Sequence, residues 1–478
     1  SMPMQKGADR LGQRLSAPKT ITRGRFRLVE NLLRAFRRFT SFQIIILGFA
    51  GVIVAGALLL MLPAASAQGA ATPFTDALFT STSAVCVTGL VVRDSGSYWS
   101  PFGQSLILLL IQIGGLGVIT MSATFLMLAG RNISLKERSA MQDALSAPSV
   151  GGIVRLTRFI LKGTFIVELT GALVMLPVFW RDHGFRGIWM AVFHSVSAFC
   201  NAGFDVLADV DAGGSLCRYA TDPVVNFTIM ALIIIGGLGF AVWGDIRHHR
   251  RFSRLSVYSR LVVIITTVLI FGGAGVFAAL EWNNPNTIGD LTVPQKLMAA
   301  LFQSVTLRTA GFATFDQNAL SDVSKAASDL LMLVGGSSGS TAGGVKTATV
   351  GVILLSAWST ARGRTSVHVM KRRIPRQAVE NASALFILVL LLSGLGAAFL
   401  SIADHVSLEN ALYETISALC TVGLTTGITS SLGTASQIIL IVLMFFGRLG
   451  IMTISVGFMA ANRAEERVSY AETKIMIG

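Results

Sequence analysis

Apolar residues in this chain of 478 residues gather into segments too long for the core of a soluble domain. A bilayer core is crossed by about 20 consecutive, mostly apolar residues of helix. Eight segments reach that length, near 42–63, 104–129, 156–180, 224–244, 260–281, 326–357, 382–402 and 435–460. The pattern therefore predicts eight transmembrane helices.

A shorter apolar stretch lies between the two members of each successive pair of segments. These stretches lie near 74–84, 187–198, 293–306 and 408–418. A helix of this length is too short to cross a bilayer core of about 30 Å. We therefore expect helices that enter the membrane and return on the same side.

Each short stretch runs into a phrase that ends on a glycine followed by Leu or Phe. The phrases are Ser83–Leu90, Ser197–Phe204, Val305–Phe312 and Ser417–Leu424. Four copies of one loop, each beside membrane-length segments, indicate a pore whose wall is assembled from four equivalent pieces of one polypeptide.

Composition and charge agree with a membrane protein. Only 13% of the residues are charged, against about 25% in a typical soluble domain. The net charge of +14 could indicate nucleic acid, but Lys and Arg lie in short linkers between apolar segments. The basic runs are Lys19–Arg38, Arg131–Arg138, Arg247–Arg251 and Arg362–Arg376. Because short cytoplasmic loops are enriched in Lys and Arg, we expect both termini in the cytoplasm, no cleaved signal peptide and no nucleic-acid partner.

All repeats then share one orientation and are related by an axis along the membrane normal. We expect an all-α polytopic membrane protein with four helix–re-entrant loop–helix repeats in a pseudo-fourfold ring around one central pore. The expected parts are a basic cytoplasmic segment at 1–40, pore repeats at 41–130, 153–247, 258–358 and 380–460, and a cytoplasmic tail at 461–478.

The glycine-ended phrases are the candidate ion site. A glycine at the end of each loop indicates a positive φ or a close approach of backbones. Four loops that turn carbonyl oxygens inward can replace the hydration shell of a cation. None of the phrases contains an acidic residue, which favours a monovalent ion, K⁺, and unequal neighbours predict loose discrimination against Na⁺. The expected filter residues are Val87, Thr88, Gly89, Asn201, Ala202, Gly203, Thr309, Ala310, Gly311, Thr421, Val422 and Gly423.

Two residue types break the equivalence of the loops. Cys86, Cys200 and Cys420 stand three residues before the glycine, where the third loop has Arg308. Without a disulfide or CxxC pattern, we expect the cysteines to pack as small residues behind the loops. Arg308 is expected to point behind its loop and tether it through a carboxylate or carbonyls, with a direct role in the pore as the alternative. Asn201 either reaches the ion with its amide oxygen or holds the loop backbone.

Each returning segment carries a second glycine signature. The signatures are Ile113–Gly117, Ile235–Gly239, Val334–Gly339 and Phe446–Gly450. Close helix packing through small residues explains the first two. The third continues as Gly335, Gly336, Ser337, Ser338, Gly339, Ser340, Thr341, Ala342, Gly343 and Gly344. This composition propagates a helix poorly, so we expect an unwound, movable constriction below the filter. The stretch Gly339–Thr347 resembles a phosphate-binding loop, but Val345 intervenes before the lysine, and nucleotide binding is not expected.

The fourth signature carries Arg448 in place of a glycine. An arginine at membrane depth is costly and functional by default. We expect an electrostatic barrier to cations below the filter, with a salt bridge across repeats as the competing account. Glu168, Glu281 and Glu414 lie in or at the ends of apolar segments. We expect them to pair with Arg308 or cap helices rather than carry protons.

The loops, the broken third returning segment and the arginine together resemble the Trk/Ktr superfamily of potassium transporters, over residues 40–478. No spanning segment occurs in 1–40, so the Ktr-type membrane subunit is the more similar branch. The resemblance implies K⁺ uptake across the plasma membrane, often stimulated by Na⁺, through a homodimer regulated by a ring of cytoplasmic nucleotide-binding subunits. It assigns the filter to Gly89, Gly203, Gly311 and Gly423, the gate to 335–344 and a barrier to Arg448. Cysteines in three filter loops leave thiol reactivity in the pore as an open alternative.

A different class remains as the rival. Alternating-access carriers, such as Na⁺/K⁺ or ammonium symporters, bind substrate at broken helices near the midplane, and one broken helix is predicted here. Fourfold re-entrant loops argue against this class. A scaffold or receptor would need a sizeable soluble domain, which the pattern does not contain, and no enzyme activity or cofactor is expected.

Overall fold

The computed structural model describes residues 41–117, 120–121, 138–139, 142, 152–207, 214–364 and 366–450. The segments expected at 1–40 and 461–478 lie outside these residues. The helices are α2 Ser41–Leu60, α3 Phe74–Val85, α4 Pro101–Leu116, α7 Ile153–His183, α8 Arg186–Phe199, α9 Pro223–Gly237, α10 Phe240–His249, α11 Val257–Glu281, α12 Val293–Thr306, α13 Asp322–Met332, α14 Thr347–Ala361, α15 Arg376–Asp404, α16 Leu408–Leu419 and α17 Thr434–Leu449. Short 3-10 turns and one two-stranded hairpin, β1 His368–Val369 with β2 Arg372–Arg373, complete the described elements.

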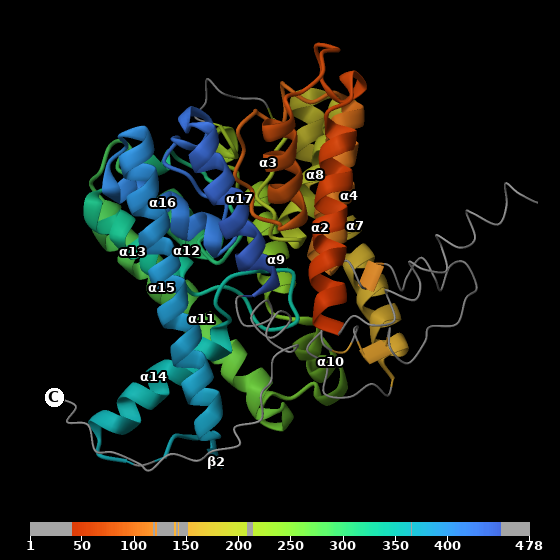
Figure 1. The fold of residues 1–478 in the computed structure, drawn as a ribbon. Coiled ribbons are helices and arrows are strands. Elements are labelled where there is room, and N and C mark those ends of the chain that lie inside the picture. The colour runs from red at the N-terminus through yellow and green to blue at the C-terminus, as the bar shows by residue number, and fades with distance from the viewer. Residues whose placement is uncertain are drawn as a thin grey trace, which may run out of the picture. The chain divides into compact units, whose positions relative to one another are not determined.

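The helices follow one order four times (Figure 1). A long helix packs against the short helix that comes after it, as α2 does with α3, α7 with α8, α11 with α12 and α15 with α16. The short helices occupy nearly the ranges that the apolar stretches predict. Local chemistry starts several of them: Thr292 and Gln295 form a capping box at α12, and the Ser407 side chain accepts a hydrogen bond from the backbone of Asn410 at α16.

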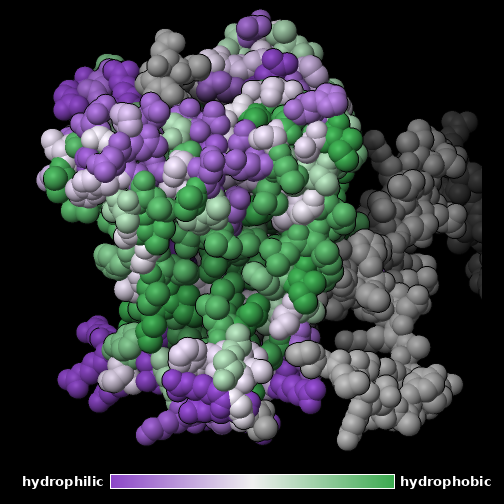
Figure 2. Space-filling view, turned by 90° about the vertical axis from the view of Figure 1, so that its left-hand side faces the viewer, coloured by the Kyte–Doolittle hydropathy of each residue, from purple (hydrophilic) through white to green (hydrophobic). Residues whose placement is uncertain are grey.

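Four helices of the described residues are long and apolar enough to cross a membrane, each the first span of an expected repeat. They are Gln43–Leu60, Val154–His183, Val257–Glu281 and Arg376–Asp404. Figure 2 shows a band of hydrophobic residues between two hydrophilic layers on one face of the molecule. Residues such as Phe271 and Leu395 are two-thirds exposed on these helices, which suits contact with lipid.

The returning segments differ from the sequence prediction. We expected a continuous span near 224–244, but α9 ends at Gly237 and α10 leaves it at 94°. The prediction missed that Gly239 adopts a φ of 92°, which an α-helix cannot contain. α4 and α17 end in the same way at Gly117 and Gly450, with φ of 89° and 82°. The third segment breaks between α13 and α14 as predicted.

Candidate ion-conduction site

Four short helices aim their carboxyl ends at the glycine loops, which we define as residues 86–90, 200–204, 308–312 and 420–424. α3, α8 and α16 are each capped by a cysteine, Cys86, Cys200 or Cys420, and α12 is capped by Leu307. The carboxyl end of a helix carries a partial negative charge. The helices therefore favour a cation near the loops.

The backbone of every glycine loop is left-handed at two positions. The glycines have φ of 101° at Gly89, 68° at Gly203, 80° at Gly311 and 91° at Gly423. Two residues earlier, φ is 49° at Val87, 56° at Asn201, 62° at Thr309 and 52° at Thr421. Three of these four are β-branched residues, for which positive φ is strained. Strained backbone of this kind clusters at functional sites, and no sequence pattern predicts it here.

The four glycines contact one another in a closed cycle. A Cβ placed on Gly89 would lie 2.5 Å from the carbonyl oxygen of Ala202. The same atom on Gly203 would lie 2.7 Å from the oxygen of Ala310, and on Gly311 2.6 Å from that of Val422. A Cβ on Gly423 would overlap the carbonyl oxygen of Thr88. Thr88 belongs to the first loop, so this contact closes the cycle. Only glycine fits at these positions.

Hydroxyl groups of the short helices hold the loops from behind. Ser83 and Ser417 accept hydrogen bonds from the backbone N–H of Gly89 and Gly423, both at 3.0 Å. In the second loop, Ser197 donates to the carbonyl of Phe204. In the third loop the serine position is Val305, and Thr306 donates instead to the carbonyl of Phe312 at 2.6 Å.

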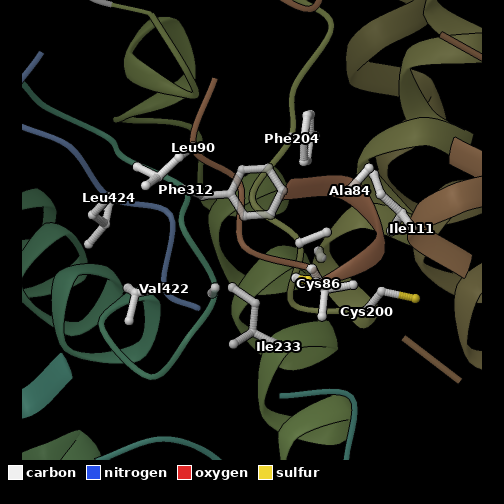
Figure 3. Close-up of a cluster of buried hydrophobic side chains, with 14 of the residues drawn as sticks. Ala84, Cys86, Leu90, Ile111, Cys200, Phe204, Ile233, Phe312, Val422 and Leu424 are labelled. Atoms are coloured by element: carbon white, nitrogen blue, oxygen red, sulfur yellow. The ribbon is translucent and has the colours of Figure 1, made fainter. Parts of the chain in front are cut away.

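The residue after each glycine is apolar and buried. Leu90, Phe204, Phe312 and Leu424 appear within one cluster of buried side chains in Figure 3. The same view labels Cys86 and Cys200 in this cluster. The three loop cysteines are fully buried, and the thiol of Cys200 lies 3.7 Å from Oε1 of Gln112 on α4. They pack behind the loops, as the sequence predicted.

The glycine signatures pack against the ends of the short helices. A Cβ on Gly114 would overlap the carbonyl oxygen of Val85, and one on Gly236 that of Phe199. Gly447 has the same relation to Leu419. The expected close packing therefore occurs between these glycines and the last carbonyl groups of the short helices, and not between the sides of two helices.

Residues 335–344, defined here as the glycine-serine loop, are not helical. A short parallel bridge between Val334 and Val345 closes their base. The backbone N–H groups of Ser337 and Thr341 donate to the carbonyls of Gly237 and Gly236 in the second repeat. The Thr341 hydroxyl donates to the carbonyl of Phe199 at 3.0 Å. The loop is therefore attached to the carboxyl ends of α8 and α9, next to the start of the second glycine loop.

The loop also meets the fourth repeat. A Cβ on Gly343 would overlap the Thr421 side chain, and one on Gly344 would lie 2.9 Å from the carbonyl of Cys420. Lys346, the lysine of the rejected phosphate-binding pattern, donates to the carbonyls of Ala342 at 2.8 Å and Gly343 at 3.4 Å. Its position as the first lysine after a glycine-rich break is the sequence feature that could have predicted this role.

Arg448 joins three repeats through backbone carbonyls. Its guanidinium donates to Thr341 of the glycine-serine loop, to Gly114 at 2.5 Å and to Gly115 at 3.1 Å. In the described part of the chain these carbonyls, not a carboxylate, are its hydrogen-bond partners. The salt bridge weighed as the competing account therefore does not occur among those residues.

The remaining candidates have varied partners. Arg308 is 6% exposed, and among the described residues its Nε has no hydrogen-bond partner, so the expected tether is not seen there. The amide nitrogen of Asn201 lies 3.5 Å from the Arg308 carbonyl and from the Thr309 hydroxyl. Asn201 thus supports the backbone of the neighbouring loop.

Among the described residues, the three buried acids accept hydrogen bonds from groups other than Arg308. Glu281 accepts hydrogen bonds from the backbone and hydroxyl of Ser321, the N-cap of α13, as the capping alternative predicts. Glu168 accepts one from Gln112 at 3.4 Å. Glu414 accepts from threonine hydroxyls, a pattern that is not evident from the sequence.

A bundle of membrane-length helices, with four short helices that lead to touching glycine loops, defines a polytopic membrane transport protein. Residues 26–467 match the TrkH family of cation transport proteins, and the chain belongs to that family. The resemblance seen in the sequence is thereby confirmed.

Several relatives match nearly full length. The potassium/sodium uptake protein NtpJ of Enterococcus hirae is 38% identical and covers 93% of this chain and 99% of its own. The Ktr system potassium uptake protein B of Bacillus subtilis is 38% identical, over 92% of this chain and 97% of its own. The crystal structure of the potassium transporter TrkH from Vibrio parahaemolyticus has the same fold, with a TM-score of 0.67 at 19% identity over 87% of this chain and 84% of that one. These relatives are transport proteins, not enzymes.

Proposed function

We propose that this chain is the ion-conducting membrane subunit of a potassium uptake system. The observation that carries the proposal is the closed cycle of Gly89, Gly203, Gly311 and Gly423. It supports four repeats, at 41–130, 153–247, 258–358 and 380–460, in a pseudo-fourfold ring of eight transmembrane helices around one pore. The names of the relatives supply the substrate, K⁺.

The filter lies at the glycine loops. Backbone carbonyls of the residues up to each glycine replace the water around a K⁺ ion, and the helix ends behind them add negative potential. The residues proposed to line it are Val87, Thr88, Gly89, Asn201, Ala202, Gly203, Thr309, Ala310, Gly311, Thr421, Val422 and Gly423. The unequal loops favour weaker K⁺ over Na⁺ discrimination than a filter of four identical loops.

The gate is the glycine-serine loop, tethered by Arg448. The contacts of Thr341 with the carbonyl of Phe199 and with Arg448 support a gate under the second glycine loop. In this position it blocks the pathway below the filter. Irregular backbone at membrane depth is tolerated where it is buried or lines a wet cavity, and release of the Arg448 contacts would let the loop move aside. The charge of Arg448 adds a barrier to cations.

Further subunits complete the system. We propose a homodimer in the plasma membrane, with lipid around it and both termini in the cytoplasm. A ring of nucleotide-binding regulatory subunits would dock on basic groups such as Arg247–Arg251 and Arg372–Arg373, in line with the relatives named as parts of a Ktr system. Na⁺ acts as an activator or a co-transported ion, and this chain itself binds no nucleotide.

A symporter with alternating access is the second candidate. Its support is that α9 and α10, like α13 and α14, are broken helices of the kind at which carriers bind substrate. The glycine cycle argues for the pore, because a carrier that rocks between two states would have to break contacts closed on all four sides.

Growth tests the function directly. A bacterium that lacks K⁺ uptake is transformed with the wild type and its regulator, and grown on limiting K⁺. We expect rescue by the wild type and none by Gly311→Ser, whose Cβ would meet the Val422 carbonyl. Equal growth of the two strains, or no rescue by wild type that reaches the membrane, contradicts the proposal.

A further inference from the structure

Two neighbouring side chains of α16, Tyr413 and Glu414, reach the segments that follow the third and the fourth glycine loops. We propose that this pair positions both segments and thereby sets the K⁺ over Na⁺ preference of the pore. The inference rests on the proposed function and adds positioning residues outside the glycine loops themselves.

Tyr413 acts on the third loop. Its side chain is fully buried, and its hydroxyl donates to Oε1 of Gln317 at 3.0 Å. Gln317 lies six residues after Gly311 and exchanges hydrogen bonds with Gln303 of α12 at 2.7 and 3.2 Å. It also donates to the carbonyl of Phe315 at 3.2 Å. The hydroxyl of the fourth repeat therefore completes a buried amide pair in the third.

Glu414 acts on the fourth loop. Its carboxylate is fully buried and accepts from the Thr425 hydroxyl at 2.8 Å and from the Thr429 hydroxyl. These threonines lie two and six residues after Gly423, and their hydroxyl oxygens are 3.0 Å apart. One carboxyl group that accepts from both hydroxyls ties two points of this segment to α16.

The position of the pair on α16 gives it control over two loops. α16 ends at Leu419 and leads directly into the fourth glycine loop. A buried polar group that loses its partner costs about 1–3 kcal/mol, so the helix, Gln317 and the two threonines must move together. A shift in this unit displaces the carbonyls of Ala310 and Val422, which lie in the glycine cycle.

No other repeat has this arrangement in its sequence. The residues nine positions before the glycine are Thr80, His194 and Phe302 in the first three repeats, against Glu414 in the fourth. The residues ten positions before are Phe79, Phe193 and Leu301, against Tyr413. The pair therefore adds an asymmetry on one side of the filter that the glycine phrases alone do not show.

The test uses Tyr413→Phe and Thr429→Val, each of which removes one hydroxyl and keeps the shape of the side chain. Tyr98 and Thr72 form a matched control, because their hydroxyls lie 3.2 Å apart in the first repeat, away from Gln317 and Glu414. Rb⁺ and Na⁺ fluxes are measured in liposomes that contain the full chain with its regulator. The readout is the ratio of the two fluxes, together with the yield of folded protein.

We expect Tyr413→Phe and Thr429→Val each to lower the Rb⁺ to Na⁺ ratio by about two- to tenfold, the range that one net hydrogen bond supports. Tyr98→Phe and Thr72→Val should leave the ratio unchanged. A wild-type ratio in both test variants overturns the inference, even if their yield falls, because a purely structural role changes yield alone. If the wild type carries no Rb⁺, the proposed function fails instead.

Discussion

A Cβ on Gly423 would overlap the carbonyl oxygen of Thr88, which joins the last glycine loop to the first. The two residues belong to opposite ends of the chain, so this contact closes a cycle that sequence neighbours cannot make. The cycle fixes how close the four loops approach. Its geometry leads to predictions that separate steric, electrostatic and packing effects.

Gly423→Ala should abolish most transport, and Gly427→Ala should not. The two glycines have nearly the same backbone conformation, with a φ of 91° at Gly423 and 90° at Gly427. Alanine therefore costs roughly 1–2 kcal/mol of backbone strain at either position. Nothing lies within 4 Å of a Cβ on Gly427, whereas a Cβ on Gly423 displaces Thr88. We expect Rb⁺ uptake to fall at least about tenfold in Gly423→Ala only, since a displaced carbonyl no longer replaces ion hydration.

The melting temperature of each variant is the control for that comparison. Similar melting temperatures with very different uptake would separate the loss of the ion site from the shared strain. Equal uptake by the two alanine variants would show that the glycine cycle does not form the pathway.

Arg448→Ala should raise flux in the absence of the regulator. The guanidinium donates to Thr341, Gly114 and Gly115, and a hydrogen bond from a charged group contributes about 1.5–3 kcal/mol. Loss of even one bond of that size shifts a closed gate toward open by at least about tenfold. Arg448→Lys keeps the charge without the planar set of donors and is the matched variant.

The two arginine variants distinguish barrier from tether. If the charge alone limits flux, Arg448→Lys behaves as the wild type. If the tether matters, both variants leak. A chain that no longer folds after Arg448→Ala would instead assign the residue to stability.

Removal of residues 338–340 should increase flux without the regulator while Rb⁺ to Na⁺ selectivity stays constant. The deletion shortens the glycine-serine loop but spares Thr341, which contacts Phe199 at the end of α8, and Gly343, which lies against Thr421 of the fourth glycine loop. Liposome flux at matched protein density is the measurement. Flux at or below that of the wild type, in protein that elutes as a single species, would count against a gate in this loop.

The cysteines should react slowly with thiol reagents at neutral pH. Cys86, Cys200 and Cys420 are fully buried behind the glycine loops. The fourth cysteine, Cys217, begins the 3-10 turn Cys217–Tyr219 between α8 and α9. Burial, with Asp316 and Asp205 nearby, raises its pKa to about 12. The thiolate is the reactive form, so below this pKa the alkylation rate of Cys217 should rise about tenfold per pH unit.

Mass spectrometry after a short pulse of iodoacetamide at pH 7, 8 and 9 reads each thiol separately. Rapid labelling of Cys200 at pH 7 in the native protein would show that its thiol faces the pathway. That result would support the alternative in which the loop cysteines are reactive groups in the pore.

Much of the architecture could be predicted because its causes are local. The short helices and their glycine loops follow from apolar length and from glycine, and Gly335–Gly344 is unwound because its composition disfavours helix. The bend between α9 and α10 could not be predicted in the same way. Gly239 belongs to a glycine signature that close helix packing also explains, and its positive φ occurs where it contacts Ser338 and Gly339 of another repeat.

The hydrogen-bond partners of the buried polar side chains were harder still to predict from the sequence. Arg448 binds carbonyls from the first and third repeats, and carbonyls carry no side-chain signature in a sequence. The positive φ of Val87 and Thr421 runs against the preference of β-branched residues. Such strain is held by tertiary contacts, so the individual sequence position does not reveal it.

The most direct test of the central claim is the uptake of radioactive Rb⁺ by liposomes that contain the purified chain and its regulator, with an outward K⁺ gradient as the driving force. The account predicts uptake that saturating external K⁺ suppresses, and loss of that uptake in Gly311→Ser, whose φ of 80° and contact with Val422 admit no side chain. Undiminished, K⁺-sensitive Rb⁺ uptake by Gly311→Ser would contradict it.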